Sequence, residues 1–125
     1  MTIPEVEVIR LGPATKTRLS TLKRRTGVEN WNVLCRWAFC LSLSDDSPIG
    51  ERHDDPGAAI EMTWKTFAGE FAELYHALLM QYAEATNLRP DEKMLSTLLR
   101  QHISRGVARL VAQKDVAALP NMLKG

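Results

Sequence analysis

Five cations near the N-terminus are the side chains best suited to binding a charged ligand. They are Lys16, Arg18, Lys23, Arg24 and Arg25, and they fall within ten residues of one another. Phosphate groups are bound by cations on flexible stems, and such contacts give affinity with little sequence preference. Residues 16–25 are therefore candidates for phosphate contacts. The alternative that the local pattern leaves open is a solvated face of an amphipathic helix.

A second group of polar side chains, richer in acids, lies further along the chain. His53, Asp54 and Asp55, with Asp45 and Asp46 nearby, are of the types that hold a divalent metal for phosphodiester cleavage. They lie among turn-forming Pro, Gly and Ser residues, whereas catalytic ligands are usually mounted on rigid elements. The glycine loop of ATPases and the Gly-x-Ser-x-Gly motif of hydrolases are absent. We therefore expect no metal, no cofactor and no enzymatic activity.

The cysteines and the two histidines further along the chain offer little further chemistry. Cys35 and Cys40 are five residues apart in a predicted helix, so their side chains point in different directions, and neither a disulfide nor a zinc site fits them. Apolar neighbours raise the pKa of a thiol, so we expect both to be inert core residues. His76 and His102 are expected to serve packing or hydrogen bonding.

The charges are unevenly distributed along the 125 residues, although the net charge is only +1. Residues 1–40 hold seven Lys/Arg against three Asp/Glu, residues 41–75 hold two against eight, and residues 76–125 hold seven against four. The near-zero total excludes a protein that coats nucleic acid by overall positive charge. No apolar run reaches the roughly 20 residues that span a bilayer, and the N-terminus lacks the pattern of a signal peptide. We expect a cytoplasmic protein with no membrane partner and a single domain, residues 1–125.

The elements that must position the cations are a strand and two helices. Residues 5–11 partly alternate polar and apolar and stop at a Gly-Pro pair, which predicts a strand. Residues 14–26 predict a helix that ends at Gly27, with a core stripe of Thr15, Leu19, Leu22 and Thr26. Residues 30–43 predict a helix so apolar around its circumference that the C-terminal half and a second subunit are both expected to cover it.

The remaining residues predict an acidic loop and two long helices. Residues 44–66 form the loop, with a short extended piece around 60–65. Thr66 is the predicted N-cap of a helix to about Ala85. A last helix is predicted from Pro90, as its first residue, to about Val111.

Two features of that last helix lead to specific expectations. Gly106, in its middle, predicts a close approach to another backbone. Its cations Arg100, Arg105, Arg109 and Lys114 are predicted to lie away from the core stripe. The fold class is mainly α, with a strand-helix-helix unit over 1–43, the acidic loop over 44–66 and a helical half over 67–125.

The strand-helix-helix order over residues 5–43 resembles a ribbon-helix-helix unit. In that architecture two chains pair their strands, and outward strand side chains read the major groove. Here those side chains are Glu5, Glu7 and Arg10. Two carboxylates facing phosphates make a poor sequence reader. A ribbon-helix-helix transcriptional regulator is therefore kept as an alternative function.

A more specific resemblance begins at Arg-Thr-Gly-Val, residues 25–28. It continues through residues 32–43, which follow the pattern Asn-x-Leu-Cys-Arg-x-Ala-x-Cys-Leu-Ser-Leu. This run resembles the signature of the DndE family, small proteins of the bacterial DNA sulfur modification, or phosphorothioation, system. The resemblance is strong over about residues 16–43 and looser over the rest, where it concerns helix order and the acidic central loop.

The resemblance implies a helical accessory protein that forms a homo-oligomer, expected to be a tetramer. It implies binding to duplex DNA, preferably nicked, while the other Dnd phosphorothioation proteins replace a non-bridging phosphate oxygen with sulfur. Oligomerisation through the helix over residues 30–43 would leave Arg36 either paired with a buried acid or at a subunit boundary. A metal-dependent DNA nickase that uses the acidic loop is the third hypothesis.

Overall fold

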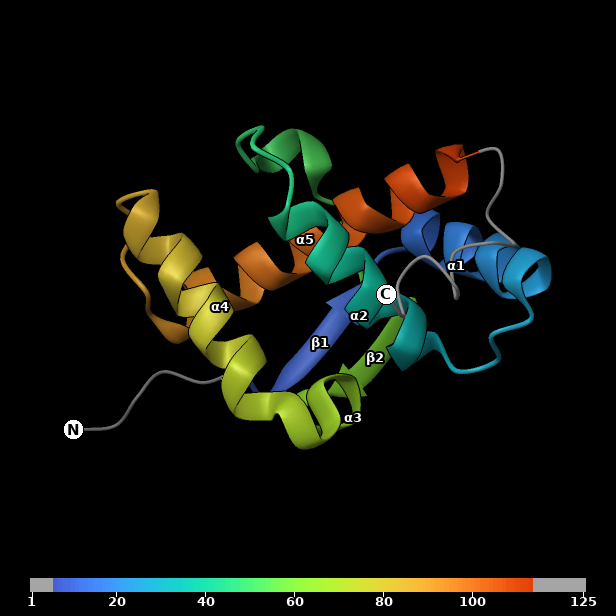
Figure 1. The fold of residues 1–125 in the computed structure, drawn as a ribbon, viewed down its shortest axis with the longest axis horizontal. Helices are drawn as coiled ribbons and strands as arrows, with labels where there is room; N and C mark the ends of the chain where they lie inside the picture. Colours follow the sequence, from blue (N-terminus) through green and yellow to red (C-terminus); the bar gives the residue numbers. More distant parts are fainter. Residues whose placement is uncertain (1–5, 114–125) are drawn as a thin grey trace.

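The longest helix, α5 (Glu92–Ala112), forms the centre of the computed structural model, which describes residues 6–113 (Figure 1). Its middle, residues 101–107, is buried on every side, because α1, α2, α4, β1 and the 3₁₀ turn η1 (Glu51–His53) all pack against it. We expect the helix over residues 30–43 to be covered by both the C-terminal half and a second subunit, and α5 supplies the first of these covers. The predicted start at Pro90 is wrong, since Asp91 is the N-cap and accepts a hydrogen bond from the Met94 N–H at 2.8 Å.

The predicted strand-helix-helix order of the N-terminal part is confirmed. β1 (Val8–Leu11) is shorter than predicted and is followed by α1 (Pro13–Thr26) and α2 (Trp31–Leu43). Gly27 ends α1 in the left-handed conformation, with φ +75°, and its N–H donates to the Lys23 carbonyl. α2 is buried along one face only, at Leu34, Cys35, Ala38, Phe39 and Ser42.

β1 pairs antiparallel with β2 (Ile60–Thr63), with Ile9 opposite Met62. β2 lies within the extended piece predicted around residues 60–65. A strand of the same chain therefore occupies one edge of β1, whereas a ribbon-helix-helix dimer takes that partner from a second chain. The buried side chains of the sheet, Ile9, Leu11 and Ile60, join the core.

The single helix predicted from Thr66 to Ala85 is wrong, because the chain bends in its first part. α3 (Trp64–Ala68), the 3₁₀ turn η2 (Gly69–Phe71) and α4 (Ala72–Ala85) replace it. Gly69 has φ +58° and ψ −137°, a conformation that favours glycine and interrupts a helix. The N-cap is Thr63 instead of Thr66, since the Thr63 hydroxyl accepts the Thr66 N–H.

An aromatic part of the core lies where α2, α3 and α4 meet. Phe39 of α2 contacts both Phe67 and Tyr75 edge-on, with ring centroids 5.8 and 5.9 Å apart. The predicted close approach at Gly106 is confirmed, since a Cβ there would overlap the backbone carbonyl of Ala38. α2 and α5 can therefore touch backbone to backbone at this point. Within residues 6–113, no helix combines the length and apolarity needed to cross a membrane.

Candidate nucleic-acid interface

The cations of α1 cover the exposed side of that helix. All five side chains are exposed, and α1 contains no acidic residue. Its buried stripe consists of Thr15, Leu19 and Leu22. The helical period places Lys16 and Lys23 on one flank of this stripe, two turns or about 10 Å apart along the axis. Arg18 and Arg25 lie on the other flank, and Arg24 points away from the core.

The five cations differ in how firmly they are held. Arg25 Nη1 donates to the Val111 carbonyl at 3.0 Å, which ties the end of α1 to the end of α5. Lys23 Nζ lies 5.9 Å from the centre of the Trp31 ring, within cation–π range. Among the residues that the structure describes, no carboxylate lies within ion-pair distance of any of the five. Their charge is therefore directed to solvent.

The start of α1 is positioned by the acidic loop. The Asp55 carboxylate accepts the Thr15 N–H at 2.6 Å, so a negative charge sits at the positive end of the helix dipole. The backbone of Asp55 also passes so close to Gly12 that a Cβ there would overlap it. The prediction of a loop without a catalytic role missed this anchoring function, because nothing in the periodicity links residue 55 to residue 15.

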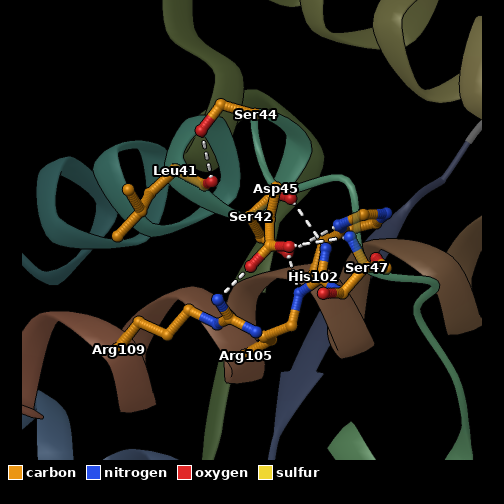
Figure 2. A network of polar contacts seen from close by, with 8 residues as sticks. All are labelled: Leu41, Ser42, Ser44, Asp45, Ser47, His102, Arg105 and Arg109. Carbon is orange, nitrogen blue, oxygen red and sulfur yellow. Dashed lines mark hydrogen bonds and ion pairs between the residues drawn. The ribbon is translucent and has the colours of Figure 1, made fainter.

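Two further acids of the loop bind arginines of α5. Asp54 and Arg100 form a two-pronged pair, with Nε–Oδ1 2.6 Å and Nη2–Oδ2 2.8 Å. This pairing holds the pKa of Asp54 below its usual range. Asp45 forms an ion pair with Arg109, shown in Figure 2. Both arginines point outward from the core as predicted, but they are occupied by these acids, unlike the cations of α1.

Arg105 was predicted to lie away from the core, and this is wrong: the residue is 3% exposed. Its guanidinium donates to Ser42 Oγ at 2.8 Å, to the Ser42 carbonyl at 2.7 Å and to the Ser47 carbonyl at 2.7 Å (Figure 2). The last carbonyls of a helix lack partners within it, and Arg105 supplies donors at the end of α2. Such a cap has no signal in helical periodicity, because Arg105 and Ser42 are 63 residues apart in the sequence.

The residues proposed for a metal site do not come together as one. No group of three or more His, Cys, Asp or Glu side chains that could hold a metal ion occurs within residues 6–113. Asp45, Asp54 and Asp55 are directed to three different partners, as described above. His53 Nδ1 accepts the Gly50 N–H at 3.1 Å, and burial together with nearby arginines lowers the pKa of His53. These side chains act as anchors of the loop.

The two cysteines occupy different environments. Cys35 is buried, and burial raises its pKa to about 12, as expected for an inert core thiol. Cys40 is exposed on α2, so the expectation that it lies in the core is wrong. Partial burial nevertheless raises the pKa of Cys40, which therefore remains a thiol at neutral pH.

The exposed side chains of the β1 segment, Glu7 directly before β1 and Arg10 within it, are poorly suited to reading bases. Glu7 and Arg10 are exposed, and Arg10 pairs with Glu61 on β2 at 3.3 Å. Glu5 lies outside the described residues, as does Lys114. The sheet therefore offers an acid and a neutralised arginine where a ribbon-helix-helix reader needs donors.

Comparison with known proteins agrees with the resemblance noted in the sequence. The family model described as "DNA sulphur modification protein DndE" matches residues 8–118. The chain belongs to the DndE family. The fold of DndE from Escherichia coli B7A, a protein involved in DNA phosphorothioation modification, is similar, with TM-score 0.71 and 21% identity over 88% of this chain and 99% of that one.

A crystal structure of a DndE mutant involved in DNA phosphorothioation is also similar. It has TM-score 0.71 and 18% identity, over 87% of this chain and all of that one. No curated protein matches. The family places this chain in DNA phosphorothioation, a pathway that other Dnd proteins carry out with it, and its mainly helical fold is the DndE fold.

Proposed function

We propose that this DndE-family protein is a DNA-binding accessory protein of phosphorothioation that contacts the duplex backbone through the cations of α1. The observation that supports the proposal is that five exposed cations lie together on one helix that contains no acid. Arg10, Arg100 and Arg109 each pair with a carboxylate, whereas Lys16, Arg18, Lys23, Arg24 and Arg25 have no described carboxylate within ion-pair distance. Unneutralised cations on one helix face are what phosphate binding requires.

We further propose that the DNA-binding unit is a homo-oligomer, a tetramer, assembled through α2. The outer face of α2 keeps Val33, Trp37 and Leu41 only half-buried and Cys40 exposed. Arg36 lies on the same helix, is half-buried, and has no described carboxylate within ion-pair distance, which suits a subunit boundary. Assembly would multiply the α1 cations into a broad basic surface. The preference for nicked duplex rests on the sequence resemblance over residues 16–43.

The decisive experiment replaces the α1 cations while leaving the fold intact. Four of them are changed to Gln together, and Arg25 is kept because it also bonds to α5. A matched control changes exposed cations elsewhere, Arg52, Lys65 and Arg89, to Gln. Binding to nicked, intact and single-stranded DNA of one sequence is measured over a range of salt concentrations. Light scattering on the same samples gives the mass of the assembly.

The four-Gln variant is expected to bind at least tenfold more weakly, and the control to bind like the wild type. The slope of log affinity against log salt should fall by about 0.9 for each phosphate that the variant no longer neutralises. Unchanged binding in the variant would refute the α1 site, and equal binding to nicked and intact duplex would refute the nick preference. A preference of about 10³-fold for one operator would instead support a transcriptional regulator. Magnesium-dependent cleavage would support a nickase.

A further inference from the structure

Phe71 and Leu74 form an apolar patch at the start of α4. They are 50% and 53% exposed, and within residues 6–113 they are the two large apolar side chains that lie exposed. Their separation of three residues places them side by side on one helix face. A single exposed apolar residue is ordinary, but two adjacent ones at one end of a molecule indicate a contact surface.

The patch continues into a groove. Leu78 lies one turn beyond Leu74, and it lines a hollow of about 290 Å³ between α4 and the end of α2. The other lining residues are Leu43, Gln81, Tyr82 and Ala85. The groove is large enough to accept an apolar side chain from another molecule. Phe71, Leu74 and Leu78, together with this groove, are called the α4 face below.

The charged side chains that residues 66–88 themselves carry are negative, while Arg36 of α2 lies against Gly69 at the start of this segment. Residues 66–88 contain three glutamates, Glu70, Glu73 and Glu84, and no Lys or Arg. All three are exposed, and no described Lys or Arg lies within ion-pair distance of them. Glu70 and Glu73 directly flank Phe71 and Leu74 in the sequence. An apolar centre with an acidic rim matches a partner that has an apolar centre and a basic rim.

We propose that the α4 face binds a basic amphipathic segment of a different protein, one that presents apolar side chains flanked by Lys or Arg. DNA and anionic membranes carry the same sign of charge as the rim and are repelled by it. A second copy packed about a two-fold axis would oppose Glu70 and Glu73 to themselves. If a second copy instead placed its α1 against this face, the DNA-binding cations would be buried between the two copies.

The α4 face lies away from the proposed DNA-binding helix α1. The role of its partner in phosphorothioation rests on the proposed function. α1 and α4 lie at opposite ends of the long axis of the molecule (Figure 1). A subunit that holds DNA at α1 would therefore leave the α4 face free for a protein that acts on that DNA. The binding itself is independent of DNA, so the two proposals can fail separately.

The test uses the full chain and two synthetic probes. The first probe is a peptide of about five helical turns that combines Leu at helical spacing with Lys, and the second carries Glu in place of each Lys. Fluorescence anisotropy gives the affinity of each labelled peptide. One variant combines Phe71→Ser with Leu74→Ser, and Ser is well tolerated at residue 71, the N-cap of α4. A second variant combines Glu70→Lys with Glu73→Lys.

We expect the wild type to bind the Lys peptide and not the Glu peptide. The serine variant should bind the Lys peptide about tenfold more weakly or worse, as for removal of central apolar anchors, while DNA binding is unchanged. The charge-reversed variant should prefer the Glu peptide. A control, Glu29→Lys, changes an exposed acid in the connection between α1 and α2 and should bind both peptides like the wild type.

Three results would overturn the inference. The first is equal affinity of the wild type for both peptides, and the second is full affinity in the serine variant. The third is a smaller assembly mass in the serine variant, which would assign the α4 face to a second copy of this chain. The four-Gln variant of α1 should retain peptide binding, so a failure to bind DNA there does not affect this inference.

Discussion

Mild acid is expected to destabilise this protein through His102 before its carboxylates protonate. His102 is completely buried. Its Nδ1 lies 2.7 Å from Ser42 Oγ, and its ring meets those of Phe39 and Tyr82 edge-on. Burial, and then the nearby charge of Arg105, lower the pKa of His102 to about 4. The site therefore holds a neutral imidazole at neutral pH.

The sign and size of the effect follow from linkage. An unfolded chain has a histidine pKa of about 6.5, so below that pH it binds a proton that folded His102 does not bind. The stabilising contribution is complete above about pH 6.5 and is lost as the pH falls toward about 4. The full difference is worth about 3 kcal/mol, because one pH unit corresponds to about 1.4 kcal/mol. The pKa of Asp54 is lowered from 3.8, so its contribution is lost only in stronger acid.

The assay is urea unfolding followed by tryptophan fluorescence between about pH 7 and pH 4.5, at one chain concentration because assembly affects stability. The variant is His102→Asn, whose side-chain amide can take the position of Nδ1 beside Ser42 but does not titrate. His53 also has a lowered pKa, so His53→Asn serves as the background in both proteins. The free energy of unfolding should fall by about 2 kcal/mol across this range with His102 present, and remain nearly flat in the variant. An equal fall in both proteins would refute the reasoning.

Three further predictions concern other parts of the fold. Gly106→Ala should lower the free energy of unfolding by about 3 kcal/mol or prevent folding, because the added Cβ would overlap the backbone of α2. Gly50→Ala is the control, since a Cβ at residue 50 has no neighbour within 4 Å, and thermal unfolding compares the two variants. Asp54→Asn should lower stability by about 1–2 kcal/mol in wild type but not in an Arg100→Met background, as a double-mutant cycle would measure. Cys40 should react with a maleimide at a low chain concentration, where the monomer prevails, and be protected at a high concentration, where the assembly forms. Equal labelling at the two chain concentrations would exclude Cys40 from the interface.

The first two helices could be predicted from the sequence because each signal is local. Residues 14–26 contain no helix breaker and end at Gly27, so the predicted and observed ends of α1 agree closely. The apolar run over residues 30–43 fixed α2 in the same way. The helix break at Gly69 was missed because periodicity continues across it, while the positive φ of that residue depends on packing.

The long-range polar contacts could not be predicted from the sequence. Asp55 caps α1 from 40 residues away, and Arg105 caps α2 from 63 residues away. Neither contact leaves a pattern, because a hydrogen bond between distant segments imposes no spacing on either one. Of the candidate site, the cations of α1 and their exposure could be foreseen, since they depend only on helical period and on the buried stripe. The acidic loop was recognised, but its anchoring role required the three-dimensional fold.

Part of the negative charge of residues 41–75 is used for contacts within the chain. Residues 41–75 carry the largest excess of acid in the chain, yet Asp45, Asp54 and Asp55 are directed to Arg109, Arg100 and the start of α1. Glu70 and Glu73 have no described Lys or Arg within ion-pair distance, and they border the exposed Phe71 and Leu74. Salt should weaken binding at α1 and at the α4 face alike, because both depend on exposed charge. It should affect the loop anchors less, because those ions are partly buried and held at fixed geometry. A subunit charged oppositely at its two ends can bind an anionic and a cationic partner at once without the two competing.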